Sequence, residues 1–222
     1  MNTVSFDLGK PLQDPFAIGQ IPVYELSEPK LVNLYEASIK RALDFGISMI
    51  GFLIIFPWLT PILYILIKTS SKGPLFFVQK RVGKNGRIFN CWKFRTMKED
   101  GLNVTRIGWL LRRSHIDELP QLINIMEGSM SLVGPRPHMI SDHERFSALI
   151  QHYDLRHQIR PGLTGLAQSY GYHGSTPDFK SIENRTRLDL HYATKITLGV
   201  DFQILLRTLK MSLPVFKNNR RK

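Results

Sequence analysis

The sequence is poor in cysteine and in acidic residues. Its one cysteine, Cys91, excludes a disulfide within the chain and fits a reducing compartment. Only 18 acidic residues oppose 30 basic ones, so the formal net charge is +12 at pH 7. Such an excess of positive charge indicates an anionic partner, which is a nucleic acid, a lipid surface or a phosphorylated substrate.

Several common sequence signals are also missing. The chain has no P-loop, no dinucleotide-binding fingerprint, no internal repeat and no low-complexity stretch. The first 40 residues do not combine a basic start, an apolar run and a small-residue cleavage site, so we do not expect a secretory signal peptide. The 7 histidines show no zinc-site spacing, and only His115 is kept as a candidate because it lies just before an acidic pair. A hydrophobic content of 43% in 222 residues still provides a core for one or two domains.

Residues 42–67 form the most apolar window, 26 residues with Asp44 as the only charge. The window is long enough to cross a bilayer. However, Pro57 and Pro61 interrupt it, and a proline inside a helix removes a backbone hydrogen bond. Cut there, the two halves would be about 21 Å and about 15 Å long, too short for a hydrocarbon layer of about 30 Å. Basic residues flank both ends, which favours a re-entrant hairpin that leaves by the face it entered. A buried core helix and a plain membrane span are the alternatives.

A β-hairpin is predicted over Gly73–Arg95. Asn85-Gly86 lies between two apolar runs and is the strongest short hairpin signal. Side chains alternate along a strand, so Lys93 and Arg95 are expected on one face. The two cations either bind an anion there or are simply solvated.

Three amphipathic helices are expected in the rest of the chain. Asn103–Arg113 has helical apolar spacing and either lies on a membrane surface or packs on a core. Asp117–Gly128 has Asp117 as a good N-cap and Gly128 as a stop. Near the end, a basic tail follows an apolar stripe that consists of Phe202, Leu205, Leu206, Leu209 and Leu213.

The acidic pair Asp117-Glu118 is the sharpest chemical feature. One carboxylate can attack phosphorus while the other holds Mg²⁺, a hard ion that binds through few carboxylates plus substrate phosphate. The alternative is an ordinary capping box at a helix start. Nearby cations favour the chemical interpretation, since arginine matches phosphate bidentately. The residues expected to converge on a pyrophosphate are Arg81, Lys93, Arg95, Arg112 and Arg136.

Longer motifs follow one another in a fixed order. They are Gln79-Lys80-Arg81-Val82-Gly83, Lys93-Phe94-Arg95-Thr96-Met97, Asp117-Glu118-Leu119-Pro120-Gln121 and Met130-Ser131-Leu132-Val133-Gly134-Pro135-Arg136-Pro137. The stretch Arg160–Gln168 and the Asp189–Tyr192 region extend the match. From about Leu34 to Leu213 the chain resembles the bacterial sugar transferase family, the monotopic polyprenyl-phosphate phosphoglycosyl transferases. Within it, the chain looks like the subgroup that starts exopolysaccharide or O-antigen repeat units.

The resemblance implies a fold and an activity. The fold would be α+β and mostly α, a monotopic membrane protein with a re-entrant helix broken at Pro57 or Pro61, amphipathic interfacial helices and a small β-hairpin. The activity would be transfer of a sugar 1-phosphate from a UDP-sugar to undecaprenyl phosphate, with release of UMP. The implied roles are a covalent phosphosugar on Asp117, Mg²⁺ binding by Glu118, and Arg136 as the arginine of the family's Pro-Arg-Pro motif. The catalytic part would lie on the cytoplasmic face of the bacterial inner membrane.

We expect a linker-like arm over residues 1–36, a membrane helix over 37–72 and a catalytic domain over 73–222. Many relatives carry an additional N-terminal half with several spans. Here only the linker-like Ile21–Glu36 corresponds to it, so the chain is expected to be a naturally short form or a catalytic fragment. Membrane lipids are expected partners and nucleic acid is not, while a homo-oligomer stays open. Two rival functions are a non-catalytic basic module that binds membrane surfaces and a Mg²⁺-dependent hydrolase of lipid pyrophosphates.

Overall fold

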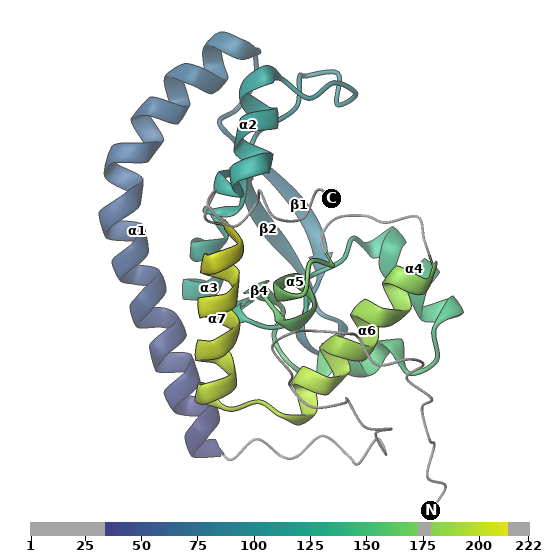
Figure 1. Cartoon of the computed structure of the whole chain (residues 1–222). Helices are drawn as coiled ribbons and strands as arrows, with labels where there is room; N and C mark the ends of the chain where they lie inside the picture. The colour runs from purple at the N-terminus through teal and green to yellow at the C-terminus, as the bar shows by residue number, and fades with distance from the viewer. Residues whose placement is uncertain (1–33, 173–178, 213–222) are drawn as a thin grey trace, which may run out of the picture.

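The structure, a computed structural model, describes residues 34–172 and 179–212. It is mostly helical with a small amount of β-structure, which confirms the predicted α+β class (Figure 1). The elements in chain order are α1 (Leu34–Ser70), β1 (Phe76–Val82), the 3₁₀ turn η1 (Lys84–Gly86), β2 (Ile88–Phe94), α2 (Arg106–Ser114), η2 (Ile116–Glu118), α3 (Gln121–Glu127), β3 (Ser131–Val133), α4 (Ile140–Leu149), η3 (Tyr153–Gln158), β4 (Gly162–Thr164), α5 (Leu166–Ser169), α6 (Phe179–Thr194) and α7 (Leu198–Ser212).

Helix α1 is continuous through both of its prolines. The predicted interruption at Pro57 and Pro61 is therefore not seen, and the re-entrant break is not confirmed. Each proline removes a single backbone N–H donor, and the hydrogen bonds of the neighbouring residues can still maintain the helix on both sides of it. Figure 1 shows α1 as a long, bowed helix along one side of the molecule.

One face of α1 is apolar and uncovered. The segment Ser38–Ser70 is long and apolar enough to cross a membrane, and only 17% of its most apolar window is buried. Trp58 is 79% exposed. The other large hydrophobic side chains exposed on this helix include Leu43, Phe45, Ile47, Ile50, Leu53, Ile54, Ile62 and Ile65. A surface of this size and composition is typical of a helix that contacts lipid or another protein.

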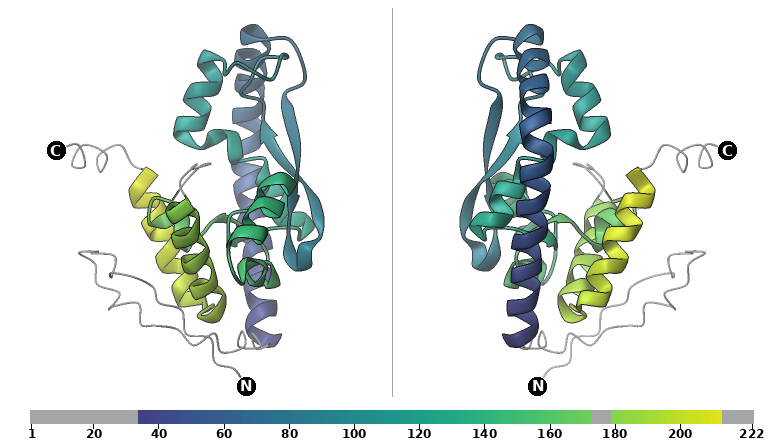
Figure 2. Two further views of the ribbon diagram at one scale, coloured as in Figure 1. Left: turned by 90° about the vertical axis from the view of Figure 1, so that its right-hand side faces the viewer. Right: turned by 90° about the vertical axis from the view of Figure 1, so that its left-hand side faces the viewer.

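The opposite face of α1 packs against the rest of the chain. Phe56, Leu63 and Ile67 are buried in the main hydrophobic core, where Phe56 stacks on Phe94 with ring centroids 6.0 Å apart. Helices α2 and α3 and strand β3 pack against α1, whereas Figure 2 shows α7 diverging from it. The core therefore forms between the long helix and the remaining elements.

Polar contacts fix the start of α1 to the same body. Asp44 is buried and accepts hydrogen bonds from Ser131 Oγ at 2.6 Å and from the backbone N–H of Leu132 at 3.2 Å. Arg41 donates to the carbonyls of Ile125 and Met126 at the end of α3, at 2.5 and 2.8 Å. These bonds satisfy carbonyl groups that a helix end leaves without a partner.

The predicted hairpin is confirmed. Strands β1 and β2 pair antiparallel from Phe76↔Phe94 to Val82↔Ile88. Asn85 and Gly86 have φ values of 54° and 72°, the left-handed conformation that tight hairpin turns require. Lys93 lies near the end of β2, where the strand contacts the η2 turn that carries the acidic pair.

The helix predicted over Asp117–Gly128 begins later than expected. Residues 116–118 form the 3₁₀ turn η2, and α3 begins at Gln121 with Pro120 in the cap position. Asp117 is therefore not the N-cap of α3, because the fixed φ of Pro120 suits a helix start and the acidic pair lies one turn earlier. Gly128 ends α3 as predicted, with a φ of 91°.

Helices α2 and α7 each expose part of their apolar residues. Trp109 and Leu110 of α2 are both 55% exposed. On α7, Phe202, Leu206 and Leu209 of the predicted stripe are exposed. Leu213 and the basic tail lie outside the described residues. The two helices thus have the composition predicted for interfacial helices.

A parallel pair of short strands was not predicted. Ser131 and Val133 of β3 pair with Gly162 and Thr164 of β4. A side chain at Gly162 would overlap the backbone of Gly134, so glycine allows the two segments to approach this closely. This contact fixes the exit of β3, from which the Pro-Arg-Pro loop continues.

Gly108 provides a test of how α2 is positioned. A Cβ atom there would overlap the carbonyl oxygen of Thr96, whereas a Cβ at Gly46 of α1 would meet nothing within 4 Å. We expect Gly108→Ala to destabilise the protein by about 1–3 kcal/mol through overpacking. Gly46→Ala should be neutral or stabilising by up to about 1 kcal/mol, since alanine is the better helix former. Thermal unfolding of both detergent-solubilised variants measures this, and equal melting temperatures would contradict the packing of α2.

Candidate active site

Glu118 is the centre of a buried ion-pair cluster. Its Oε1 accepts a hydrogen bond from Lys93 Nζ at 2.7 Å and another from Arg136 at 2.8 Å. Arg136 also donates to Oε2 at 3.3 Å, so its guanidinium contacts both carboxylate oxygens. The three residues come from β2, η2 and the loop after β3. The structure therefore brings together three of the residues that the sequence analysis assigned to the site.

The two carboxyl groups of the acidic pair have opposite pKa shifts. Burial opposes ionisation of Glu118, but the charges and hydrogen bonds of Arg136 and Lys93 outweigh it and hold the pKa of Glu118 well below its usual range. Burial raises the pKa of Asp117, and the neighbouring Glu118 charge raises it further. Glu118 is thus a fixed anion at neutral pH, while Asp117 is an anion that the fold does little to stabilise.

Asp117 is buried, at 7% exposure, yet poorly partnered. Within the described part of the chain, its carboxylate makes no hydrogen bond or ion pair. Lys93 and Arg112 are close enough to favour its charged form electrostatically. Arg112 itself is held by a 2.9 Å hydrogen bond from its Nε to Thr96 Oγ1. A carboxylate with free lone pairs among cations is chemically suited to attack an electrophile.

Arg81 supports the loop that carries Arg136. It donates to the carbonyl of Pro137 at 2.9 Å and to Gln79 Oε1 at 2.5 Å. Arg95 has a different position from the one expected. It is buried and donates to the carbonyls of Ser71 and Lys72 just after the end of α1. Lys93 and Arg95 were expected on one face of the hairpin. Arg95 instead lies just beyond the end of β2, and its hydrogen bonds link the hairpin to the end of α1.

A second buried ion pair lies behind Arg136 and was missed by sequence reasoning. Arg156 donates to Asp189 Oδ2 at 2.6 Å, and both side chains are almost fully buried, at 1% and 2% exposure. The same guanidinium donates to the backbone carbonyl of Arg136 at 2.8 Å. It therefore holds the Pro-Arg-Pro backbone from the side opposite Glu118. Arg156 and Asp189 are 33 positions apart, and no local pattern indicated the pair.

The donor set of the acidic pair fits a hard divalent cation. Mg²⁺ is bound through one or two carboxylates, with water and phosphate oxygens completing its shell. Asp117 has free carboxylate oxygens, and Glu118 Oε2 has only the 3.3 Å bond from Arg136. Glu118 Oε1 is already shared by two cations. A metal would therefore be held through Glu118 Oε2, with the remaining ligands from outside the protein.

These features define an α+β protein with one helix suited to a membrane and a buried acidic pair among cations. The family model described as bacterial sugar transferase matches residues 35–214. The chain therefore belongs to the bacterial sugar transferase family.

Individual relatives support this assignment. The UDP-glucose:undecaprenyl-phosphate glucose-1-phosphate transferase of Xanthomonas campestris pv. campestris is 36% identical over 217 residues, which cover 91% of this chain and 45% of that protein. The UDP-N-acetylgalactosamine-undecaprenyl-phosphate N-acetylgalactosaminephosphotransferase of Aeromonas hydrophila is 34% identical over 213 residues, which cover 89% of this chain and 50% of that protein. The exopolysaccharide production protein PSS of Rhizobium leguminosarum bv. phaseoli is 38% identical over 191 residues, which cover 79% of this chain and 95% of that protein. The chain thus spans about half the length of the first two relatives.

The raised pKa of Asp117 gives a prediction about stability. Below the unfolded pKa, near 4, the side chain is protonated in both states. Above the raised folded pKa, ionisation favours the unfolded state, so folding loses stability as pH rises through this interval. Asp117→Asn should therefore melt higher than the wild type at pH 7 in EDTA, and the gain should vanish towards pH 4. Asparagine caps a helix as well as aspartate, so a purely capping role would give no gain at pH 7.

The control is Asp100→Asn. Hydrogen bonds from the backbone of Leu102 and from Asn103 lower the pKa of this exposed carboxyl group. Its ionised form is favoured by the fold, so removing the charge should give no gain at pH 7. An equal rise in melting temperature in Asp117→Asn and Asp100→Asn would contradict the prediction that the fold disfavours the ionised form of Asp117.

Proposed function

We propose that the chain transfers a sugar 1-phosphate from a UDP-sugar to undecaprenyl phosphate, giving undecaprenyl-diphosphate-sugar and UMP. The single observation that carries the proposal is a buried Asp117 with no hydrogen bond or ion pair to the described residues, beside a Glu118 whose charge is neutralised by Lys93 and Arg136. A structural acidic residue would be expected to have its own partner. Two relatives described above are named as transferases that act on undecaprenyl phosphate, and these names support the same donor and acceptor classes.

The reaction would proceed in two displacements. An Asp117 oxygen attacks the phosphorus that bears the sugar, the bond from this phosphorus to the bridging oxygen breaks, and UMP leaves with that oxygen. A phosphate oxygen of undecaprenyl phosphate then attacks the same phosphorus and frees the Asp117 carboxylate. Lys93, Arg112 and Arg136 would stabilise the negative charge on the diphosphate during both steps.

Mg²⁺ is the cofactor of this proposal. It would be held by Glu118 Oε2 together with donor phosphate oxygens, and it would supply charge neutralisation for the leaving UMP. The chain's own part is to keep Glu118 ionised and oriented. The bidentate contact from Arg136 does this, since it fixes the plane of the carboxylate.

The covalent step gives a direct prediction. Purified protein given a UDP-sugar and Mg²⁺, without lipid acceptor, should gain the mass of one phosphosugar by intact mass spectrometry. The Asp117→Asn variant should gain none and should lose nearly all turnover, because an amide is not a nucleophile. UDP-glucose and UDP-N-acetylgalactosamine are both tested as donors, since the named relatives differ in their sugar. An adduct on the Asn variant would overturn the assignment.

Glu118→Gln and EDTA test the metal in the same assay. Both should suppress the adduct strongly, whereas Asp100→Asn should leave it unchanged. Full adduct formation in EDTA would contradict the role of Mg²⁺. Free sugar phosphate released without an acceptor would instead identify a hydrolase. If no UDP-sugar gave an adduct or UMP, the non-catalytic membrane module would be the better description.

We also propose that α1 lies in the cytoplasmic leaflet of the bacterial inner membrane and does not cross it. Its buried contacts recur from Asp44 to Ile67, about 35 Å of helix. A helix that crossed the membrane directly would carry these packed elements into the lipid. The exposed residues Trp58 of α1, Trp109 of α2 and Phe202 of α7 would anchor the protein to the membrane. In the membrane, the change of direction that keeps α1 in one leaflet would be centred on Pro57 or Pro61, where backbone donors are missing from the otherwise continuous helix.

Cysteine labelling tests this topology. Single cysteines replace Ser38 and Arg87, both exposed, in a Cys91→Ser background. A membrane-impermeant reagent should label neither position in intact spheroplasts and both in inverted vesicles. A cysteine in a periplasmic protein of the same cells is the positive control. Labelling of Ser38→Cys in spheroplasts, with Arg87→Cys protected, would show that α1 crosses the membrane.

A further inference from the structure

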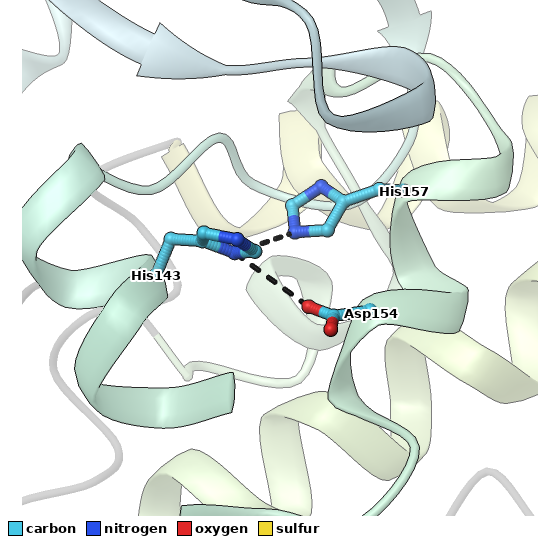
Figure 3. A group of neighbouring side chains, drawn as sticks. All are labelled: His143, Asp154 and His157. Atoms are coloured by element: carbon cyan, nitrogen blue, oxygen red, sulfur yellow. Dashed lines mark hydrogen bonds and ion pairs between the residues drawn. The ribbon is translucent and has the colours of Figure 1, made fainter. Parts of the chain in front are cut away.

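A cluster of metal-ligating side chains lies outside the acidic pair. His143 comes from α4, while Asp154 and His157 come from η3, and Figure 3 shows the three side chains converging between these elements. His157 Nε2 is 3.2 Å from His143 Nδ1, and Asp154 Oδ1 is 3.8 Å from the same nitrogen. One ligand atom from each residue lies within 4.8 Å of the others. None of these residues contributes to the proposed phosphosugar chemistry.

Local structure explains why the three side chains meet. In a 3₁₀ helix, side chains at positions i and i+3 eclipse each other, so Asp154 and His157 share a face of η3. His143 and Ser147 are one turn apart on α4 and face the same region. Ser147 Oγ donates to Asp154 Oδ2 at 2.8 Å. This bond orients the carboxylate and leaves Oδ1 directed to the histidines, as an outer-shell partner does in metal sites.

The donor atoms and their spacing fit zinc. Zinc–nitrogen bonds of about 2.0–2.1 Å in tetrahedral geometry place two nitrogen ligands about 3.3 Å apart. The two ring nitrogens here are 3.2 Å apart. Two imidazoles and one carboxylate suit zinc and similar transition metals better than Mg²⁺, which prefers oxygen ligands. The Asp154 side chain is 65% exposed, which leaves a path for the ion and an open coordination position.

The cluster is also next to the support of the Pro-Arg-Pro loop. His157 itself is buried, at 7% exposure. The Arg156 guanidinium, next in sequence, bonds to Asp189 and to the carbonyl of Arg136.

We propose that His143, Asp154 and His157 form a structural zinc site that joins α4 to η3. The site is separate from the acidic pair and from its Mg²⁺. Because η3 also carries Arg156, the zinc ion would stiffen the segment that supports the Pro-Arg-Pro backbone. This consequence rests on the proposed function, whereas zinc binding itself does not.

Metal binding is measured on the full chain in detergent after metal removal, with Zn²⁺ alone as the probe. The parent protein and every variant in this experiment carry Asp117→Asn and Glu118→Gln, so the acidic pair cannot bind the ion. Competition with a chromophoric chelator should give one tight site per chain. Loss of an outer-shell partner alone weakens metal binding roughly 10- to 100-fold. His143→Gln or Asp154→Asn removes a direct ligand, so each should weaken zinc binding by at least that much. His152→Gln, a histidine outside the cluster on the same segment, is the matched control and should bind as the parent does.

Cobalt substitution gives an independent readout. Co²⁺ in a tetrahedral site with nitrogen ligands absorbs in the visible range, and this band should appear with the parent and with His152→Gln but not with His143→Gln. His143 and Asp154 are not buried, so their variants should fold even if a His157 variant does not. Absence of zinc binding by the parent, or equal affinity in His143→Gln, Asp154→Asn and His152→Gln, would overturn the proposal. Neither result would affect the test of the covalent intermediate.

Discussion

Glu118 is bound simultaneously by a lysine from the hairpin and by an arginine from the loop after β3. Without it, Lys93 and Arg136 would face each other as like charges in a largely buried place. The carboxylate therefore joins three segments that are far apart in the chain. It also leaves Asp117, its sequence neighbour, without either cation as a direct partner. One ion-pair cluster thus both assembles the site and leaves Asp117 chemically available.

The remaining elements hold this cluster from outside. Arg81 fixes the loop at the carbonyl of Pro137, and Arg156 fixes it at the carbonyl of Arg136. Removing one partner from a buried pair such as Arg156–Asp189 typically costs about 3–5 kcal/mol, because the other charge is left uncompensated. Each of these two guanidiniums bonds to one backbone carbonyl of the loop and also to a side chain. Part of the chain's positive charge is therefore structural, which the net charge alone did not reveal.

Sequence alone predicted what depends on local chemistry. The hairpin followed from Asn85-Gly86, the end of α3 from Gly128, and the acidic pair with Lys93 and Arg136 from motifs. The start of α3 was misplaced because Asp117 is a good cap in isolation, yet Pro120 fixes the start. Arg95 was assigned to the site by strand alternation, and that rule does not extend past the strand end. The Arg156–Asp189 pair and the meeting of His143 with His157 depend on tertiary packing, which no local pattern encodes.

The long apolar helix is also part of the main hydrophobic core. Asp44 is the only charge in the apolar window. In the structure it receives hydrogen bonds from Ser131 and Leu132 at the strand that leads to the Pro-Arg-Pro loop. Arg41, one of the basic flanking residues, caps the end of α3. The polar residues of α1 thus fix the distance between its apolar face and Glu118. A site held at a fixed depth relative to that face is what the proposed reaction between a water-soluble donor and a lipid acceptor would require.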